Sequence, residues 1–441
     1  LGQTHLKGAS IRTTVDLVLR DIVKIFTDVS LQAAGQLTLG KSVDADVANT
    51  RSLSFNGGDT AAINVNGVVG GLVSLKTIEL VNSESTSFVA AVTADTSVVL
   101  RNAGLGIHFL GGLNTPTLSV AAAPFALTLR GTVAVTNAVT MANTGYLQLG
   151  GVESDDLYFV GGLTATAPSG LGLAGTLRTA DQNMVLGRAG STITLLADST
   201  LNSGAGTLRL ASPITTGAEA YRWRIVSTGT TTLNAAVGVG TALTSLTTNA
   251  GGTVVMRGGV ITTSGAQTYN DAVLLDNISH VTTLNTSNTA VLFGSSVNNA
   301  STTAEALTIN AGTGAVTFQG AVGDSTTNHA IGDLVVNSGA ATTFASTVDA
   351  ASVTTDAAGT VVIQGGRITT SGAQTYNDAV LLDNIGHVTT LNTSNAAVLF
   401  GSSVNNATTS AESLTINAGT GAVTFQGAVG DSTTNHAIGD L

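Results

Sequence analysis

The chain contains no cysteine and only four prolines among its 441 residues. Without cysteine, neither disulfides nor thiolate metal sites can hold the fold together. All four prolines lie before residue 214, so the rest of the chain has no residue that is unable to donate a hydrogen bond to a β-ladder. These absences favour a fold that is held together by backbone hydrogen bonds between strands.

Charged side chains are also scarce, at 10% of the chain, and basic ones are almost missing from its second half. Residues 225–441 carry 2 basic and 12 acidic side chains, a net charge of −10. Nucleic acids and anionic lipid headgroups need a basic partner surface. We therefore expect no nucleic-acid partner. Apolar runs fall short of the roughly 18 residues of a membrane-spanning helix, so we expect no membrane-spanning segment.

The dominant feature that is present is a near-identical duplication. Residues 258–334 recur at 365–441, an offset of 107 positions, with six substitutions in 77 positions. The substitutions are Val260 to Arg367, Ser279 to Gly386, Thr289 to Ala396, Ser301 to Thr408, Thr303 to Ser410 and Ala306 to Ser413. A stacked repeat protein gains length from each copied unit, whereas an enzyme gains little from copying its residues, so we expect no enzymatic activity and no catalytic residues.

Short apolar strands separated by turn residues fill the duplicated region. They start at Leu307, Leu334, Val353, Val380 and Leu414, and the four unequal intervals between these starts together make one period of the duplication. We interpret the period as five turns of about 21 residues, within the range of solenoid repeats. Each strand that starts a turn is followed by Asn or Asp and then Gly, which predicts corners where stacked Asn side chains form ladders.

The sequence thus predicts an all-β solenoid of stacked parallel strands. We divide it into a non-identical solenoid region over residues 1–224, serving as an N-terminal cap or assembly region, a first copy over 225–334 and a second copy over 335–441. The chain opens on Leu1 and stops at Leu441 inside a repeated passage, and we expect both ends to be cuts in a longer polypeptide.

One early segment allows two structures. Val15, Val18, Leu19, Ile22 and Phe26 fall at helical spacing, which would suit an amphipathic capping helix over residues 14–27. The same segment is rich in β-branched residues, and we favour strands there.

Repeated carboxylates are the candidate metal ligands. Asp271 and Asp276 recur as Asp378 and Asp383 at strand ends, where they offer hard oxygen ligands for calcium. No calcium-loop motif surrounds them. Solvated corner carboxylates are the simpler interpretation, with no cofactor, and calcium is the alternative.

Three acidic residues, Glu153, Asp155 and Asp156, form the densest acidic cluster. Polysaccharide-cleaving β-helices use clustered carboxylates for acid-base chemistry. Adjacent residues of a strand point to opposite sides, however, so at most one of the two aspartates can join Glu153. We favour a solvated turn.

A run of aromatic and basic residues, Tyr221, Arg222, Trp223 and Arg224, contains the only tryptophan. Such a run can stack on sugars or grip a partner, and it can equally close a junction between two solenoid segments by cation–π packing. We favour the junction. The duplicated histidines, His280 with His387 and His329 with His436, stand among small polar residues, and we expect turn histidines rather than catalytic bases.

Two repeated motifs carry a family resemblance. The sequence of residues 263–273 returns at 370–380, and that of residues 307–318 returns at 414–425. These motifs resemble repeats of very large secreted bacterial adhesins of the filamentous haemagglutinin-like kind, over about residues 246–441. The resemblance implies a right-handed parallel β-helix, located outside the cell at the bacterial surface and exported by a dedicated outer-membrane partner.

These observations leave three hypotheses for the function. The first is an adhesive or structural fibre shaft that contacts a host or cell-surface ligand. The second is a self-assembling filament, sheath or surface-layer protein whose partners are neighbouring copies. The third is a β-helical polysaccharide-degrading enzyme.

Overall fold

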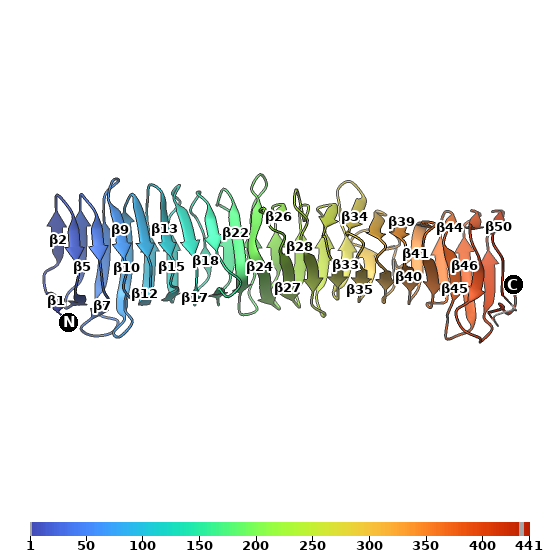
Figure 1. Cartoon of the computed structure of the whole chain (residues 1–441), viewed down its shortest axis with the longest axis horizontal. Helices are drawn as coiled ribbons and strands as arrows, with labels where there is room; N and C mark the ends of the chain where they lie inside the picture. Colours follow the sequence, from blue (N-terminus) through green and yellow to red (C-terminus); the bar gives the residue numbers. More distant parts are fainter. Residues whose placement is uncertain (1, 432–435) are drawn as a thin grey trace. The chain divides into compact units, whose positions relative to one another are not determined.

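A computed structural model describes residues 2–431 and 436–441. Within these residues the chain forms 50 strands and no helix. Parallel strands stack as a β-solenoid of about 18 turns with about 23 residues in each turn, which confirms the predicted fold class (Figure 1). The described residues contain no helix with the length and hydrophobicity that a membrane span requires.

The strands belong to two compact units, an N-terminal unit over residues 1–217 and a C-terminal unit over residues 218–441. In each unit every turn crosses three parallel sheets, which we call faces P, Q and R in the N-terminal unit and faces A, B and C in the C-terminal unit. Strand β27 (Arg222–Ser227) spans the boundary expected at residue 224 and lies wholly in the C-terminal unit.

The N-terminal unit distributes its strands over the three faces as follows. Face P contains β1 (Gln3–Leu6), β4 (Ile22–Ile25), β7 (Val43–Ala45), β14 (Leu113–Thr115), β17 (Thr132–Val135) and β20 (Asp156–Phe159). Face Q contains β2 (Ser10–Thr13), β5 (Val29–Ala33), β8 (Ser52–Asn56), β10 (Leu75–Asn82), β15 (Thr117–Val120), β18 (Val139–Thr140), β21 (Leu163–Ala165), β23 (Met184–Leu186) and β25 (Leu208–Leu210). Face R contains β3 (Leu17–Leu19), β6 (Leu37–Leu39), β9 (Ala62–Val65), β11 (Ser85–Phe88), β13 (Gly106–Phe109), β16 (Ala126–Leu129), β19 (Leu147–Leu149) and β26 (Ile214–Thr216). Three strands pass from one face to the next, namely β12 (Val92–Leu100), β22 (Leu171–Arg178) and β24 (Ile193–Gly204).

The C-terminal unit contains both copies of the duplication. Face A contains β27, β29 (Ser245–Thr248), β32 (Gln267–Tyr269), β35 (Val291–Phe293), β38 (Val316–Phe318), β40 (Ala341–Phe344), β42 (Thr360–Ile363), β45 (Ala379–Leu382) and β48 (Val404–Asn406). Face B contains β28 (Thr230–Leu233), β30 (Thr253–Met256), β33 (Ala272–Leu275), β36 (Val297–Asn299), β43 (Arg367–Thr370), β46 (Val388–Thr393) and β49 (Ser413–Asn417). Face C contains β31 (Val260–Thr262), β34 (Val281–Asn285), β37 (Ala306–Gly312), β39 (Ile331–Ser338), β44 (Gln374–Tyr376), β47 (Val398–Phe400) and β50 (Val423–Phe425). Strand β41 (Val348–Thr355) passes from face B to face C.

Alternation of apolar and polar residues produces these strands. In β38, Val316 and Phe318 are buried in the solenoid interior while Thr317 between them points outward, as the alternation predicts. The early segment with helical spacing forms the strands β3 and β4, so the prediction of strands there is confirmed.

Aromatic rings stack along the interior of the C-terminal unit. On face A the rings of Tyr269, Phe293, Phe318 and Phe344 follow one another with centroids 5.3, 4.9 and 5.4 Å apart. Offset stacking of this kind contributes about 0.5–1.5 kcal/mol per pair beyond the burial of the rings. The stack therefore joins four successive turns through their interior.

The two copies of the duplication occupy different faces. Strand β32 lies on face A, whereas its counterpart β44 lies on face C, paired with β41 and β47. In the same way β33 lies on face B and its counterpart β45 on face A, while β34 lies on face C and β46 on face B. From β32 to β44 the chain completes four turns and crosses two further faces. One period of the duplication is therefore four and two-thirds turns, and the second copy is rotated by one face.

This result corrects the interpretation of the period as five turns. The strands that start at Leu307, Leu334 and Val353 lie on face C, but those at Val380 and Leu414 lie on faces A and B. The number of residues between these strands therefore does not give the number of turns, because the strands do not all lie on one face. The number of residues in a turn also varies along one face. On face A, Phe344 is the register partner of Phe318 on one side and of Ile363 on the other, and Ile363 is much closer to it in sequence.

Ladders of Asn side chains show the same rotation. Asn337 donates to Asn310 (2.7 Å) and Asn310 donates to Asn285 (2.8 Å) along face C. In the second copy Asn417 donates to Asn392 (2.8 Å), but on face B. The predicted Asn ladders are confirmed, and each copy carries its ladder to a different face.

Candidate functional site

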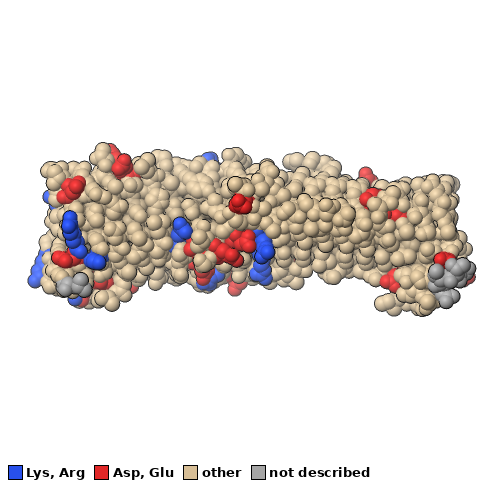
Figure 2. Space-filling model, viewed as in Figure 1, with Lys and Arg blue, Asp and Glu red and all other residues tan. Residues whose placement is uncertain are grey.

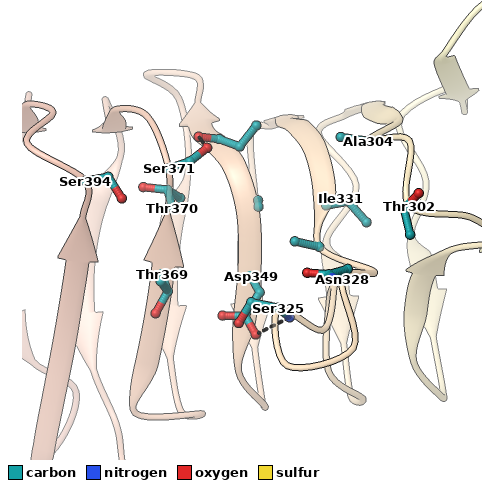
Figure 3. Close-up of a pocket in the computed structure, with 13 residues that line it drawn as sticks. Thr302, Ala304, Ser325, Asn328, Ile331, Asp349, Thr369, Thr370, Ser371 and Ser394 are labelled. Atoms are coloured by element: carbon teal, nitrogen blue, oxygen red, sulfur yellow. Dashed lines mark hydrogen bonds between the residues drawn. The ribbon is translucent and has the colours of Figure 1, made fainter.

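A corner groove lies in the C-terminal unit where face B turns into face C (Figure 3). Two loops, residues 300–305 and 323–330, protrude on successive turns, whereas β41 passes the same corner on the next turn without a loop. The missing loop leaves a groove of about 440 Å³, lined by small and hydroxyl-bearing residues that include Thr302, Ser325 and Ser394.

Asp349, one of the residues that line the groove, forms an ion pair with Arg367. Asp349 is 3% exposed and accepts hydrogen bonds from Arg367 Nη1 and Nη2 at 2.8 and 3.2 Å. The backbone N–H of Ser325 donates to the same carboxylate at 3.3 Å, as drawn in Figure 3. Because both carboxylate oxygens are occupied, Asp349 is poorly placed to act as a general base. The other polar side chains that line the groove are uncharged, and most of them are hydroxyl groups.

The Asp349–Arg367 pair is specific to the second copy. The equivalent positions of the first copy hold Ala242 and Val260, so a carboxylate and a guanidinium replace two small apolar residues together. This pair was not predicted, because Ala242 lies before the near-identical stretch of residues 258–334. The available signal was that Val260 to Arg367 is the one substitution of the six that changes the size and charge of the side chain.

The four candidate calcium ligands do not converge. Asp271 and Asp276 lie at opposite ends of the four-residue strand β33, and Asp378 and Asp383 lie in the same way around β45. Asp276 accepts a hydrogen bond from Arg257 Nε (2.5 Å), and Asp383 accepts one from Gln364 Nε2 (2.7 Å). Among the described residues, no three His, Asp or Glu side chains are grouped as metal ligands.

Two of these carboxylates are buried rather than solvated, which corrects the simpler interpretation. Asp271 and Asp378 are 1% and 2% exposed, and each accepts a hydrogen bond from a backbone N–H of the preceding turn, that of Gly252 (2.7 Å) or of Gly359 (2.6 Å). Burial raises the pKa of both carboxyl groups above the usual range. They therefore fasten one turn to the next.

Two buried glutamates also join neighbouring turns, and they were not among the predicted site residues. Glu305 and Glu412 are 3% and 2% exposed, and burial raises the pKa of both. Glu305 accepts a hydrogen bond from the backbone N–H of Asn277 at 2.7 Å. A glutamate among small residues resembles an exposed loop residue in sequence, and its burial depends on the turn that covers it.

The side chains of the aromatic and basic run point to opposite sides of strand β27. Trp223 points into the interior of the C-terminal unit and is 1% exposed, opposite Leu246 of the next turn. Arg222 and Arg224 point outward and are exposed, and Tyr221 is half-buried. The tryptophan is therefore a core residue of its unit and is not available to stack on a ligand.

The acidic cluster of the N-terminal unit is also divided. Asp155 is buried and accepts hydrogen bonds from the backbone N–H groups of Gly131 (3.0 Å) and Gly151 (2.7 Å). Asp156 points outward and binds Arg178 through both carboxylate oxygens at 2.8 and 2.9 Å, while Glu153 is exposed. The two aspartates lie on different sides, as predicted, but Asp155 stabilises a turn from within rather than facing solvent.

The duplicated histidines lie in turns. His280 and His387 adopt positive φ values of 57° and 55°, are exposed, and donate from their backbone N–H to the carbonyls of Asn277 and Asn384. His329 Nδ1 lies 3.0 Å from Thr327 Oγ1. His436 donates from its backbone N–H to the carbonyl of Asp431 at 2.8 Å. These positions confirm the interpretation as turn histidines.

Charged groups are sparse over the surface shown in Figure 2, and most of it is formed by uncharged side chains. The two arginines after residue 225 are both paired, Arg257 with Asp276 and Arg367 with Asp349. Comparison of the chain with protein-family models, with curated proteins and with solved structures finds no significant match.

Proposed function

We propose that the protein is a structural or adhesive shaft that stands outside the cell at a bacterial surface. The observation that carries this proposal is the rotation of the second copy by one face. Each copy adds four and two-thirds turns, or roughly 22 Å of stack at the spacing of β-strands. The repeat therefore lengthens the stack and distributes its surface features around the axis.

A filament, sheath or surface layer is the second candidate, with neighbouring copies as partners. Lateral packing through the repeated surface would require the same features on the same face at short intervals. Equivalent features return to one face only after three copies, because each copy advances by two-thirds of a turn beyond whole turns. This geometry favours the shaft over a layer built through the repeats.

The adhesive part of the proposal includes a ligand on a host or cell surface and an outer-membrane partner for export. Both follow from the resemblance of residues 246–441 to the repeats of large secreted adhesins. The low density of charge on the surface supports contact with an uncharged ligand rather than with nucleic acid.

Electron microscopy of the purified protein tests the proposal. Separate thin particles at all protein concentrations are the expected result for a shaft. Ordered tubes, ribbons or sheets that form as the concentration rises would show a self-assembling protein instead. Turnover of a polysaccharide by the purified protein would support the third hypothesis, an enzyme.

A further inference from the structure

One aromatic side chain stands apart from all others in the chain. Tyr146 is 40% exposed, whereas the tryptophan, the other tyrosines and the phenylalanines are buried or half-buried. Tyr146 lies directly before β19 on face R of the N-terminal unit. Since exposing an aromatic ring forgoes the free energy of burying it, the position of this ring requires an explanation.

The ring of Tyr146 packs against the following turn of the solenoid. It lies over Gly170 and Gly172 of the following turn, where a Cβ on Gly170 would come within 3.4 Å of the ring and a Cβ on Gly172 would clash with the tyrosine hydroxyl. The two glycines thus leave the space that the ring fills.

A row of polar side chains runs beside the ring along face R. Gln148 is the register partner of Gly172, Thr128 is that of Gln148, and His108 is that of Thr128. His108 Nδ1 lies 3.1 Å from Thr128 Oγ1, and Gln148 donates to the carbonyl of Gly150, so its own carbonyl oxygen remains available. Burial lowers the pKa of His108, so that the imidazole is neutral near pH 7.

We propose that Tyr146, Gln148 and His108 form a binding site for a neutral glycan, with the buried Thr128 holding the His108 imidazole in place. Sugar rings present a face of C–H groups that packs on the electron-rich face of an aromatic ring, and their hydroxyls bond to neighbouring amide and hydroxyl groups. Tyr146, Gln148 and His108 supply both kinds of contact. They carry no charge to balance an anionic sugar.

This inference goes beyond the proposed function, because a structural shaft does not need a glycan-binding site. The site lies outside the duplicated region, so it occurs once in the chain and not once per copy.

Isothermal titration calorimetry of the full chain tests the site. The probes are neutral hexasaccharides of β-1,4-linked glucose and of β-1,4-linked N-acetylglucosamine. We expect at least one of them to bind, and Tyr146→Ala to weaken that binding by roughly tenfold or more, as expected for loss of one stacked ring. Tyr146→Phe keeps the ring and should retain most of the affinity.

Tyr158→Ala is the matched control. Tyr158 is a second outward-facing tyrosine of the N-terminal unit, but Arg178 lies 3.8 Å above its ring and covers it. This variant should bind as the unaltered protein does. The proposal is overturned if neither hexasaccharide binds at millimolar concentration, if Tyr146→Ala binds unchanged, or if Tyr158→Ala loses as much affinity as Tyr146→Ala.

Discussion

Single residues in this solenoid act mainly by joining one turn to the next. Asp271 and Asp378 do so with a carboxylate buried beneath the preceding turn. Arg257 and Gln364, which are equivalent positions, contact Asp276 and Asp383 with a charged and an uncharged donor respectively. The second copy thus retains the hydrogen bond between turns, although its donor is uncharged.

The buried carboxylates predict how stability depends on pH. Burial raises the folded-state pKa of Asp271, Asp378, Glu305 and Glu412, so between about pH 4 and the raised values the folded chain binds more protons than the unfolded chain. The free energy of unfolding should therefore fall as the pH rises through this window. The contribution of these groups is complete below about pH 4.

Urea unfolding followed by the fluorescence of Trp223, the only tryptophan, reports this dependence for the C-terminal unit. The double variant Asp271→Asn with Asp378→Asn should lose part of the pH dependence and gain stability at neutral pH. Asp440→Asn, at an exposed carboxylate, should leave the dependence unchanged. An unaltered slope in the double variant would contradict the role of the buried pair.

The ion pair between Asp349 and Arg367 gives a second prediction at the residue scale. Arg367→Val, which restores the residue of the first copy, leaves the Asp349 carboxylate buried with only the Ser325 N–H as partner. We expect a loss of about 2 kcal/mol, between the values for exposed and fully buried pairs, since Arg367 is partly exposed.

The double variant Arg367→Val with Asp349→Ala recreates the Val260 and Ala242 combination and should recover most of the stability. Urea unfolding of the four proteins gives the coupling energy between the two positions. If the two single losses simply add in the double variant, the pair is not coupled and its assignment is wrong.

At the scale of elements, the interior stack of rings predicts the cost of opening a cavity. Phe318 is 1% exposed and lies between Phe293 and Phe344. Phe318→Ala should lower the free energy of unfolding by about 3–5 kcal/mol. Thr317→Ala, on the outward side of the same strand, should change it by no more than about 0.5 kcal/mol. Equal effects from the two variants would mean that the stack does not stabilise the turns.

Strands were predictable from the sequence, but their faces were not. Alternation placed Val316 and Phe318 inward because a strand shows its side chains with a period of two. The face of a strand instead depends on every corner before it. Strand β41 passes from face B, where it pairs up to Ala350, to face C, where it pairs from Val353, with no break in the strand. Such a corner has no Gly or Pro to mark it. The Asp349–Arg367 pair and the burial of Asp271 were unpredictable for the same reason, because both need the register of neighbouring turns.

At the scale of the whole molecule, the relation between the two copies decides which way the repeated surface faces. A period of five turns would place equivalent residues on one face and give the repeated surface a single direction. A period of four and two-thirds turns places them on different faces. Because equivalent residues lie on different faces, we prefer the proposal of a shaft over that of a layer that packs through one repeated face.

The most direct test uses disulfides, because the chain has no cysteine of its own. Outward-facing Thr354 of β41 is the register partner of Thr375, and Val362 is that of Leu381. Neighbouring parallel strands bring such Cα atoms to roughly 5 Å, within the range that a disulfide spans. The structure therefore predicts that Thr354→Cys with Thr375→Cys, and Val362→Cys with Leu381→Cys, form disulfides on mild oxidation. It predicts none for Thr354→Cys with Leu381→Cys. A disulfide in that last variant, without one in the first two, would place the strands that start at Val353 and Val380 in one column and contradict the rotation of the copies.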